Sequence, residues 1–143
     1  MFDMDNNVIT LNKLYDIAEE NNIIVYDFSL NPVKSMSVPG AIGIDSKHIE
    51  TKAEERVCLA HELAHCVQSA FYTGCSPFEL RERYEYRADK WAIQKLIPFD
   101  RLSDALSKGI KTIWELAEYF EVTEDYIKKA LKLYEEKLML LQH

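Results

Sequence analysis

Apolar and polar residues follow two different periods in the first third of the chain. Residues 10–21 place apolar side chains three or four positions apart behind a threonine, which predicts a first helix. Residues 22–30 are instead rich in β-branched and aromatic residues, a composition that favours a strand. Asn-Pro and Pro-Gly breaks then delimit two more short strands, at about 33–38 and 41–45. This part of the chain therefore predicts one helix followed by a three-stranded sheet.

From residue 51 onward the hydrophobic period is helical. Thr51 is followed three positions later by Glu54, which is the spacing of a capping box. The helix that starts there is expected to continue to about Tyr72, before Gly74 and Pro77 oppose it. Further helices are expected at 78–97, 99–107, 111–120 and 123–141. The pattern predicts an α+β fold in a single domain, residues 1–143, with a small three-stranded sheet packed against about five helices.

The charge and composition argue against several classes of protein. The 143 residues carry a net charge of −7, which disfavours direct nucleic-acid binding because phosphate neutralisation needs a basic surface. No apolar run approaches the roughly 20 residues that span a bilayer, and the N-terminus lacks the order of a secretory signal. Three cysteines cannot form a closed set of disulfides, which favours a reducing compartment. We therefore expect a cytoplasmic protein that does not contact membranes.

Two histidines bracket a glutamate in the helix that starts near residue 51. His61 and His65 are four residues apart, so both imidazoles lie on one helix face and can bind one metal ion. Glu62 points about 100° away around the helix, where it can reach a water molecule beside that ion. A hydrolytic zinc site takes three protein ligands and leaves one position open. The third ligand should therefore come from a second element.

The next helix carries a second pair of residues at the same spacing. Glu85 and Asp89 are four residues apart, within or beside the apolar face of the helix expected at 78–97. Two carboxylates buried there without a cation would be costly. A Zn²⁺ ion bound by Glu85, with Asp89 accepting a hydrogen bond from a ligand histidine, would satisfy both. The two helices together predict a zinc site made of His61, His65 and Glu85.

These motifs resemble those of a known class of enzymes. The segment HELAH, residues 61–65, followed by EYRAD, residues 85–89, is similar to the HExxH and ExxxD pattern of gluzincin zinc proteases. The longer segments LAHELAH and EYRADKWAIQKLIP, with a sheet before the first of them, resemble more specifically the ImmA/IrrE family of small metallopeptidases. This resemblance covers roughly residues 20–100, and it implies a zincin-like pair of active-site helices.

The resemblance also implies a role for each matching residue. His61, His65 and Glu85 would bind zinc, as the residue spacing also suggests. Glu62 would be the general base of a zinc-dependent endopeptidase, and Asp89 would orient a ligand histidine. Members of the family cleave or inactivate a transcriptional repressor, often one encoded beside them on phage or other mobile DNA. A repressor or similar regulatory protein, recognised in trans, is therefore the expected partner.

Two further features concern substrate binding. Tyr72, Tyr84 and Tyr86 are candidates for a side chain that stabilises the oxyanion, and the motifs do not choose among them. The short strand AIGID, residues 41–45, is a candidate for an edge strand that pairs with an extended substrate.

Other interpretations of the candidate site stay open at the level of sequence. His61 and His65 could be core histidines, and Glu85 and Asp89 could be ordinary solvated residues of a helix. Cys58 lies one turn before His61 and could complete a Cys-His-His site. A non-catalytic, zinc-stabilised module that docks a regulator would use the same ligands as an endopeptidase.

A second alternative is direct DNA binding by residues 112–131. Their sequence resembles a helix-turn-helix, with the turn at Val122 and Thr123. The second helix would, however, bring Glu124 and Asp125 towards the phosphates, which would repel them. A packing role for this segment is therefore favoured.

Overall fold

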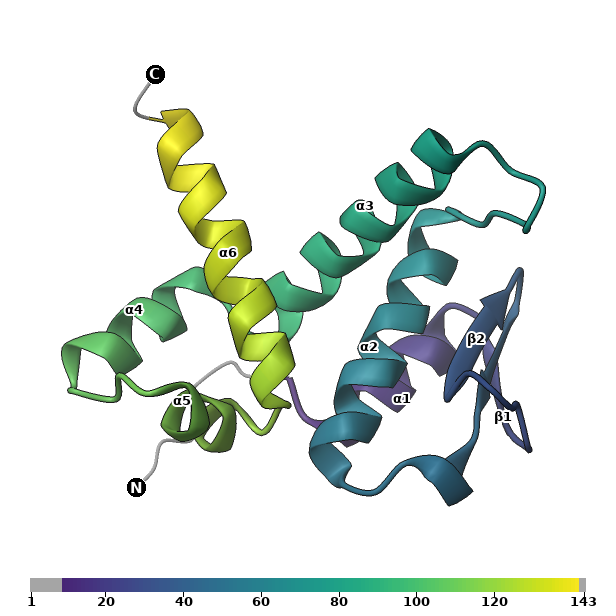
Figure 1. Ribbon diagram of the computed structural model, residues 1–143. Helices are drawn as coiled ribbons and strands as arrows, with labels where there is room; N and C mark the ends of the chain where they lie inside the picture. Colours follow the sequence, from purple (N-terminus) through teal and green to yellow (C-terminus); the bar gives the residue numbers. More distant parts are fainter. Residues whose placement is uncertain (1–8, 142–143) are drawn as a thin grey trace.

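The computed structural model describes residues 9–141, with side chains through residue 139 (Figure 1). Six α-helices and a three-stranded mixed sheet form this part of the chain, which confirms the predicted α+β class. The elements are α1 (Leu11–Glu20), β1 (Ile24–Asp27), β2 (Ser35–Val38), β3 (Ala41–Ile44), a 3-10 helix η1 (Ser46–His48), α2 (Lys52–Gln68), α3 (Phe78–Leu96), α4 (Phe99–Ser107), α5 (Ile113–Phe120) and α6 (Glu124–Leu141). The single domain over residues 1–143 stays a prediction, since its two ends lie outside the described residues.

The central strand of the sheet is β3, which lies between β1 and β2. β2 runs antiparallel to β3 and precedes a tight turn at Gly40, whose φ of 82° suits glycine. β1 pairs in parallel with the other side of β3. The prediction that AIGID is an edge strand is therefore wrong, because both of its sides are paired. In the described part of the chain, the free edges belong to β1 and β2.

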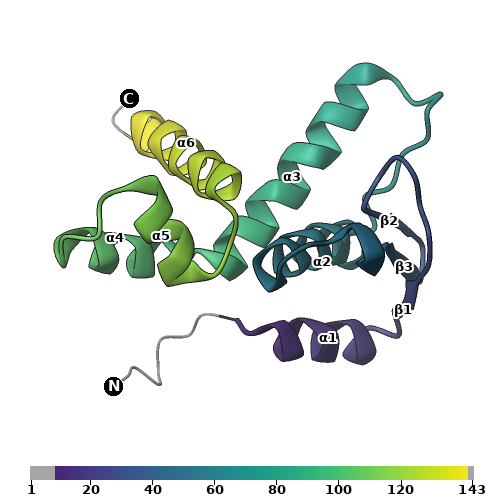
Figure 2. The ribbon, with the colours of Figure 1, turned by 60° about the horizontal axis from the view of Figure 1, so that its bottom comes forward.

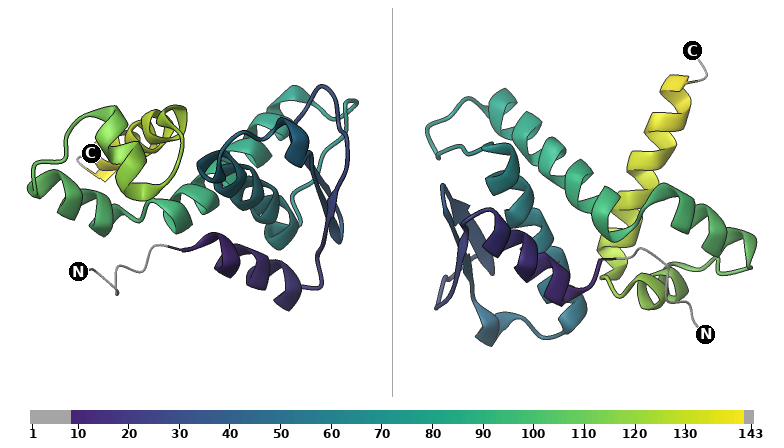
Figure 3. Two further views of the ribbon diagram at one scale, coloured as in Figure 1. Left: turned by 90° about the horizontal axis from the view of Figure 1, so that it is seen from below. Right: turned by 180° about the vertical axis from the view of Figure 1, so that it is seen from behind.

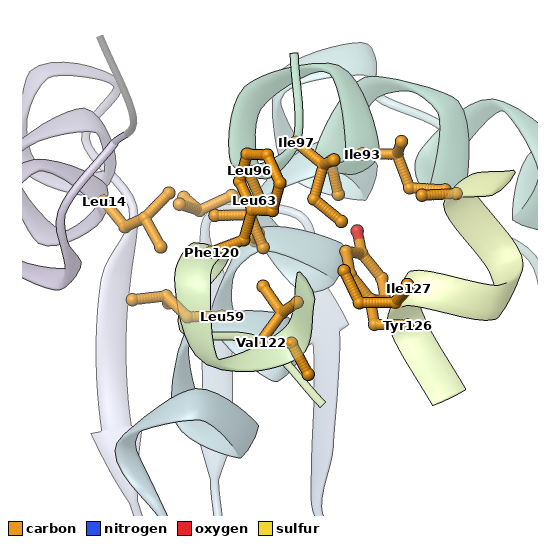
Figure 4. Packing of buried hydrophobic residues seen from close by; sticks show 14 of the residues in the cluster. Leu14, Leu59, Leu63, Ile93, Leu96, Ile97, Phe120, Val122, Tyr126 and Ile127 are labelled. Carbon is orange, nitrogen blue, oxygen red and sulfur yellow. The ribbon is translucent and has the colours of Figure 1, made fainter. Parts of the chain in front are cut away.

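α2 packs against the sheet, α1 and α3. Figures 2 and 3 show that α1 and α2 lie on the same side of the sheet, while α4, α5 and α6 gather at the far end of α3. One core joins these parts, and Figure 4 shows side chains from α1, α2, α3, α5 and α6 meeting in it. Its fully buried members include Leu14, Leu59, Leu63, Ile93, Leu96, Phe120 and Ile127. Among residues 9–141, no helix combines the length and apolar character needed to cross a bilayer.

α2 ends earlier than the sequence pattern predicts. Its last residue is Gln68 rather than about Tyr72, because Ser69 adopts the left-handed conformation, with φ 52° and ψ 40°. The Ala70 N–H then donates to the His65 carbonyl at 2.9 Å, which turns the chain back over the last helical turn. This turn brings the backbone of Ala70 next to the side of His65.

A buried arginine connects α2 to the C-terminal helices. Arg56 is 3% exposed, and its guanidinium donates hydrogen bonds to the carbonyl of Phe120 at 2.5 Å, of Glu121 at 2.6 Å, and of Ile9. Phe120 and Glu121 lie at the C-terminal end of α5, where carbonyls lack helical partners and carry partial negative charge. The guanidinium therefore caps α5 from a different helix and holds the two helices at a fixed distance.

We predict that replacing this arginine destabilises the fold. Arg56→Ala leaves three carbonyls without a donor in the interior, so it should lower the free energy of unfolding by roughly 2–4 kcal/mol. Thermal and urea unfolding followed by circular dichroism measure this loss. Arg83→Ala on α3 is the matched control, because Arg83 is exposed and its loss should change stability by less than about 0.5 kcal/mol. Equal stabilities of the two variants would contradict the capping role.

Candidate metal centre

The residues of the predicted site come from α2 and α3, which pack against each other (Figure 1). His61 and His65 occupy successive turns of α2, and Glu85 and Asp89 occupy successive turns of α3. The spacing of four residues places each pair on one helix face, and helix packing turns the two faces towards each other. All four side chains therefore meet in one place between the helices.

Both candidate ligand histidines face the same carboxylate. His61 Nε2 is 3.0 Å from Glu85 Oε1, and His65 Nε2 is 2.9 Å from Glu85 Oε2. One candidate ligand atom from each of these three residues lies within 4.8 Å of the other two. Glu85 is partly exposed, but its carboxylate points at the imidazoles rather than into solvent.

The other nitrogen of each imidazole is already bound. His61 Nδ1 lies 3.2 Å from Asp89 Oδ1, and His65 Nδ1 lies 2.7 Å from the carbonyl oxygen of Ala70. Both partners are acceptors, so each Nδ1 carries a proton and each Nε2 is left to face Glu85. The contact with Ala70 depends on the early end of α2. Sequence reasoning predicted a partner such as Asp89 but had no signal for a backbone carbonyl.

This arrangement fits a bound metal ion. Neutral imidazole lone pairs at 3.0 and 2.9 Å from a carboxylate repel it unless a proton or a metal ion lies between them. Ligand atoms at about 2.0–2.1 Å from a tetrahedral zinc ion are about 3.3 Å apart, and one atom from each of the three residues lies within 4.8 Å of the others, so small side-chain movements would bring them to one ion. Two nitrogens and one carboxylate oxygen are also a donor set typical of zinc at hydrolytic sites. His61, His65 and Glu85 can therefore hold such an ion.

The charges of the site also shift several pKa values. Burial disfavours the imidazolium form of His61, but hydrogen bonds with Asp89 and Glu85 outweigh it and raise the pKa of His61 to about 10. Burial likewise raises the pKa of Glu85, yet hydrogen bonds with both histidines and Tyr72 hold it well below its usual range. The surroundings thus favour an ionised carboxylate opposite positive charge, which a proton on His61 supplies and which a bound metal ion would supply after displacing that proton.

Glu62 lies beside the ligand set rather than within it. Its side chain is 7% exposed and lines a cleft of about 400 Å³ together with His61, His65 and Glu85. The Ser35 hydroxyl, from β2, donates a hydrogen bond to Glu62 Oε2 at 2.8 Å. This contact fixes the direction of the carboxylate, and the sequence offered no signal for it because Ser35 and Glu62 lie in different elements. The position of Glu62 agrees with the predicted separation of base from ligands.

Only one of the three candidate tyrosines lines the cleft. Tyr72 lies in the segment after α2, and its hydroxyl donates to Glu85 Oε2 at 2.7 Å. Burial and this hydrogen bond raise the pKa of Tyr72 to about 12, so the phenol keeps its proton at neutral pH. Tyr84 and Tyr86 lie outside the cleft lining, the former beside Arg87 and the latter half exposed.

Cys58 does not join the ligand set. It is a free, partly buried cysteine whose thiol contacts Ser35, and it is absent from the metal-ligating cluster found among the described residues. The desolvation of the thiol is the main cause that raises the pKa of Cys58, which opposes the thiolate form that a zinc ligand needs. The described site therefore has two nitrogens and one carboxylate, without sulfur.

A lysine from the C-terminal helix reaches the same network. Lys129 Nζ, on α6, is 3.3 Å from Asp89 Oδ2, while Asp89 Oδ1 faces His61. The carboxylate of Asp89 thus bridges α6 and the candidate ligand His61. Sequence reasoning missed Lys129, because 40 positions separate it from Asp89 and no local pattern relates the two.

The paired helices, the histidine and glutamate donors and the adjoining cleft define a candidate metal site of the kind found in metallopeptidases. A family model described as Peptidase_M78, IrrE N-terminal-like domain, matches residues 18–132. The chain belongs to this metallopeptidase family, which confirms the resemblance to ImmA/IrrE proteins. The match extends past residue 100 and includes α5 and the first half of α6, with Lys129. No curated protein matches the chain.

We predict that the contacts of Asp89 tune metal affinity. Asp89→Ala removes the acceptor that orients His61, so it should weaken Zn²⁺ binding by about 10- to 100-fold. Lys129→Ala removes only a partly exposed ion pair and should weaken binding by about threefold. Competition with a chromogenic chelator gives both dissociation constants. Lys128→Ala, an exposed neighbour on α6, is the matched control, and unchanged affinity in Asp89→Ala would refute the orienting role.

Proposed function

We propose that the protein is a zinc-dependent endopeptidase of the gluzincin type. The observation that carries the proposal is the convergence of His61, His65 and Glu85 at one point, with Glu62 beside them in an open cleft. A purely structural zinc site is closed by four protein ligands, whereas a catalytic site keeps one position open. The three described donors and the adjoining cleft support the catalytic arrangement.

The proposed mechanism assigns a separate task to each group. His61, His65 and Glu85 would hold the zinc ion, which would supply positive charge to polarise a scissile carbonyl and to lower the pKa of a nearby water molecule. Glu62 accepts a proton from the attacking water and passes it to the leaving amine. Ser35 holds Glu62 Oε2 at 2.8 Å, so the carboxylate keeps one orientation through both transfers. Asp89 and Ala70 keep the imidazoles in the tautomers that present Nε2.

The free edge of β2 supports binding of substrate as an added strand. The Asp45 N–H donates to the Lys34 carbonyl at 2.9 Å, next to the pair Ser35 and Ile44. Hydrogen-bonded and non-hydrogen-bonded pairs alternate in an antiparallel ladder, so the backbone groups of Ser35 and Ser37 point away from β3. Both serines line the cleft. An extended peptide that pairs with them would pass beside Glu62.

We further propose that the substrate is a transcriptional repressor or a similar regulatory protein, recognised in trans in the cytoplasm. The resemblance to ImmA/IrrE proteins supports this class of substrate. The net charge of −7 and the exposed Glu124 and Asp125 at the start of α6 disfavour the alternative of direct DNA binding. A separate protein partner is therefore the proposed target.

We predict that Glu62→Gln abolishes hydrolysis and leaves the metal in place. The substitution keeps the shape and the hydrogen bond from Ser35 but removes the base, so cleavage of a fluorogenic peptide library should fall by at least about 100-fold. Zn²⁺ content, measured by atomic emission, should stay near one ion per chain in this variant. His65→Ala should lose both the ion and the activity.

The same pair of variants distinguishes an enzyme from a binding module. Full biological effect in Glu62→Gln, together with retained Zn²⁺, would overturn the endopeptidase and favour a zinc-stabilised module that docks a regulator. Retained Zn²⁺ in His65→Ala would instead overturn the assignment of this ligand set.

We predict that Tyr72 is the side chain that stabilises the oxyanion. Its hydroxyl lies in the cleft, 2.7 Å from Glu85, and stays protonated, so Tyr72→Phe should lower kcat by about 100-fold with little change in KM. Tyr86→Phe is the matched control, because Tyr86 is exposed outside the cleft and its loss should not change kcat. Steady-state kinetics on a single cleaved peptide measure both, and equal kcat values in the two variants would rule out this role.

A further inference from the structure

The outer face of the sheet is apolar and uncovered. α1 and α2 pack on the opposite face, and Figures 2 and 3 show no helix over the outer one. Side chains from β1, β2 and the residue after β1 give this face its character, and each is about half exposed. They are Ile24 at 57%, Tyr26 at 50%, Phe28 at 50%, Met36 at 42% and Val38 at 46%. Five large apolar side chains on one face of a three-stranded sheet indicate an interaction surface.

This face, called the outer apolar face below, contains a hollow of about 450 Å³. Tyr26 and Phe28 form one wall, and Met36 and Val38 form the other. Gly43 forms part of the floor, where a Cβ atom would lie 3.1 Å from the Phe28 ring. The missing side chain in the central strand therefore creates space between the two outer strands.

The hollow adjoins the catalytic cleft along β2. Met36 lines both, so one strand separates them. Successive side chains of a strand point to opposite faces, and here Ser35 and Ser37 line the cleft while Met36 and Val38 form the outer row. A polypeptide that pairs with the free edge of β2 continues this alternation, because the added strand shares the pleat of the sheet.

We propose that Met36 and Val38, the part of the outer apolar face on β2, select the substrate, because a strand added beside β2 reaches these side chains and not those of β1 at the opposite edge. The occupant is the substrate polypeptide itself, an extended segment with apolar side chains at every second position, added to the sheet as a fourth strand beside β2. One row of its side chains enters the cleft beside Glu62, and the alternate apolar row covers Met36 and Val38. This inference rests on the proposed endopeptidase function and extends it to the sequence pattern that the enzyme recognises.

The substrate is favoured as the molecule that covers Met36 and Val38 because β2 also borders the cleft. A strand paired beside Ser35 and Ser37 necessarily presents its alternate side chains next to the outer row. Met36 and Val38 carry no charge, so this row favours apolar partners over charged ones. A second copy of the chain could cover the same face, and the experiment below separates the two occupants.

Two peptides of identical composition test the proposal. The first has about eight residues in which Leu and Thr alternate, with a Lys at each end, and the second has the Leu residues grouped together. Both carry a fluorescent label and are titrated into the Zn²⁺-loaded Glu62→Gln protein, which prevents cleavage. Fluorescence anisotropy gives the two dissociation constants. The alternating peptide should bind at least about tenfold more tightly than the grouped one.

Matched variants locate the surface. Met36→Gln and Val38→Thr keep side-chain size and remove apolar character, so each should weaken binding of the alternating peptide by about fivefold. Leu138→Gln is the control, because Leu138 is a similarly exposed apolar residue, 46%, near the far end of α6. The affinity of the Leu138→Gln variant for both peptides should match that of the Glu62→Gln parent protein.

The outcomes separate this proposal from the proposed function. Equal affinities for the two peptides, absence of binding, or no effect of Met36→Gln and Val38→Thr would each overturn the selection surface, even where Glu62-dependent cleavage persists. A dimer seen by analytical ultracentrifugation and lost in both variants would assign the face to a second copy and overturn it as well. Pattern-selective binding without Glu62-dependent cleavage would support the surface and overturn the endopeptidase.

Discussion

Repulsion between like groups is the constraint that organises this molecule. Two imidazole nitrogens face the two oxygens of one carboxylate at 3.0 and 2.9 Å, an arrangement that needs positive charge from a proton or from a metal ion. The surrounding contacts keep it from relaxing: Asp89 and the Ala70 carbonyl bind the opposite ring nitrogens, and α2 and α3 hold the backbones. The fold thus keeps three candidate metal ligands facing one another at the wall of an open cleft.

The proximity of the three candidate ligands could be predicted from the sequence because it depends on local geometry. A spacing of four on each of two helices defines one face per helix, and the apolar pattern of the second helix orients Glu85 inward. The strand order could not be predicted, because long-range pairing determines which strands flank β3 and the alternation of residues does not encode it. The early end of α2 was missed for a related reason, because Ser69 lacks the glycine that usually marks a left-handed position.

The partners that hold the site in place were the hardest to foresee. Ser35, the Ala70 carbonyl and Lys129 lie on three different segments, and each acts through one contact with a residue that sequence reasoning had found. Their residue types are common and their spacings carry no period. β2 is the clearest case, because its four residues have three roles. Ser35 orients Glu62, and Ser35, Met36 and Ser37 line the cleft. Met36 and Val38 provide two of the five side chains of the outer apolar face.

The ion pair between Lys129 and Asp89 connects the C-terminal helix to the candidate metal site. If the packing of α6 raises metal affinity through Asp89, a bound metal ion stabilises the packing of α6 by the same free energy, because coupling between two binding equilibria is reciprocal. Metal loading and the position of α6 therefore report on each other. A protein that binds α6 would therefore have an affinity that depends on whether the distant candidate site holds a metal ion.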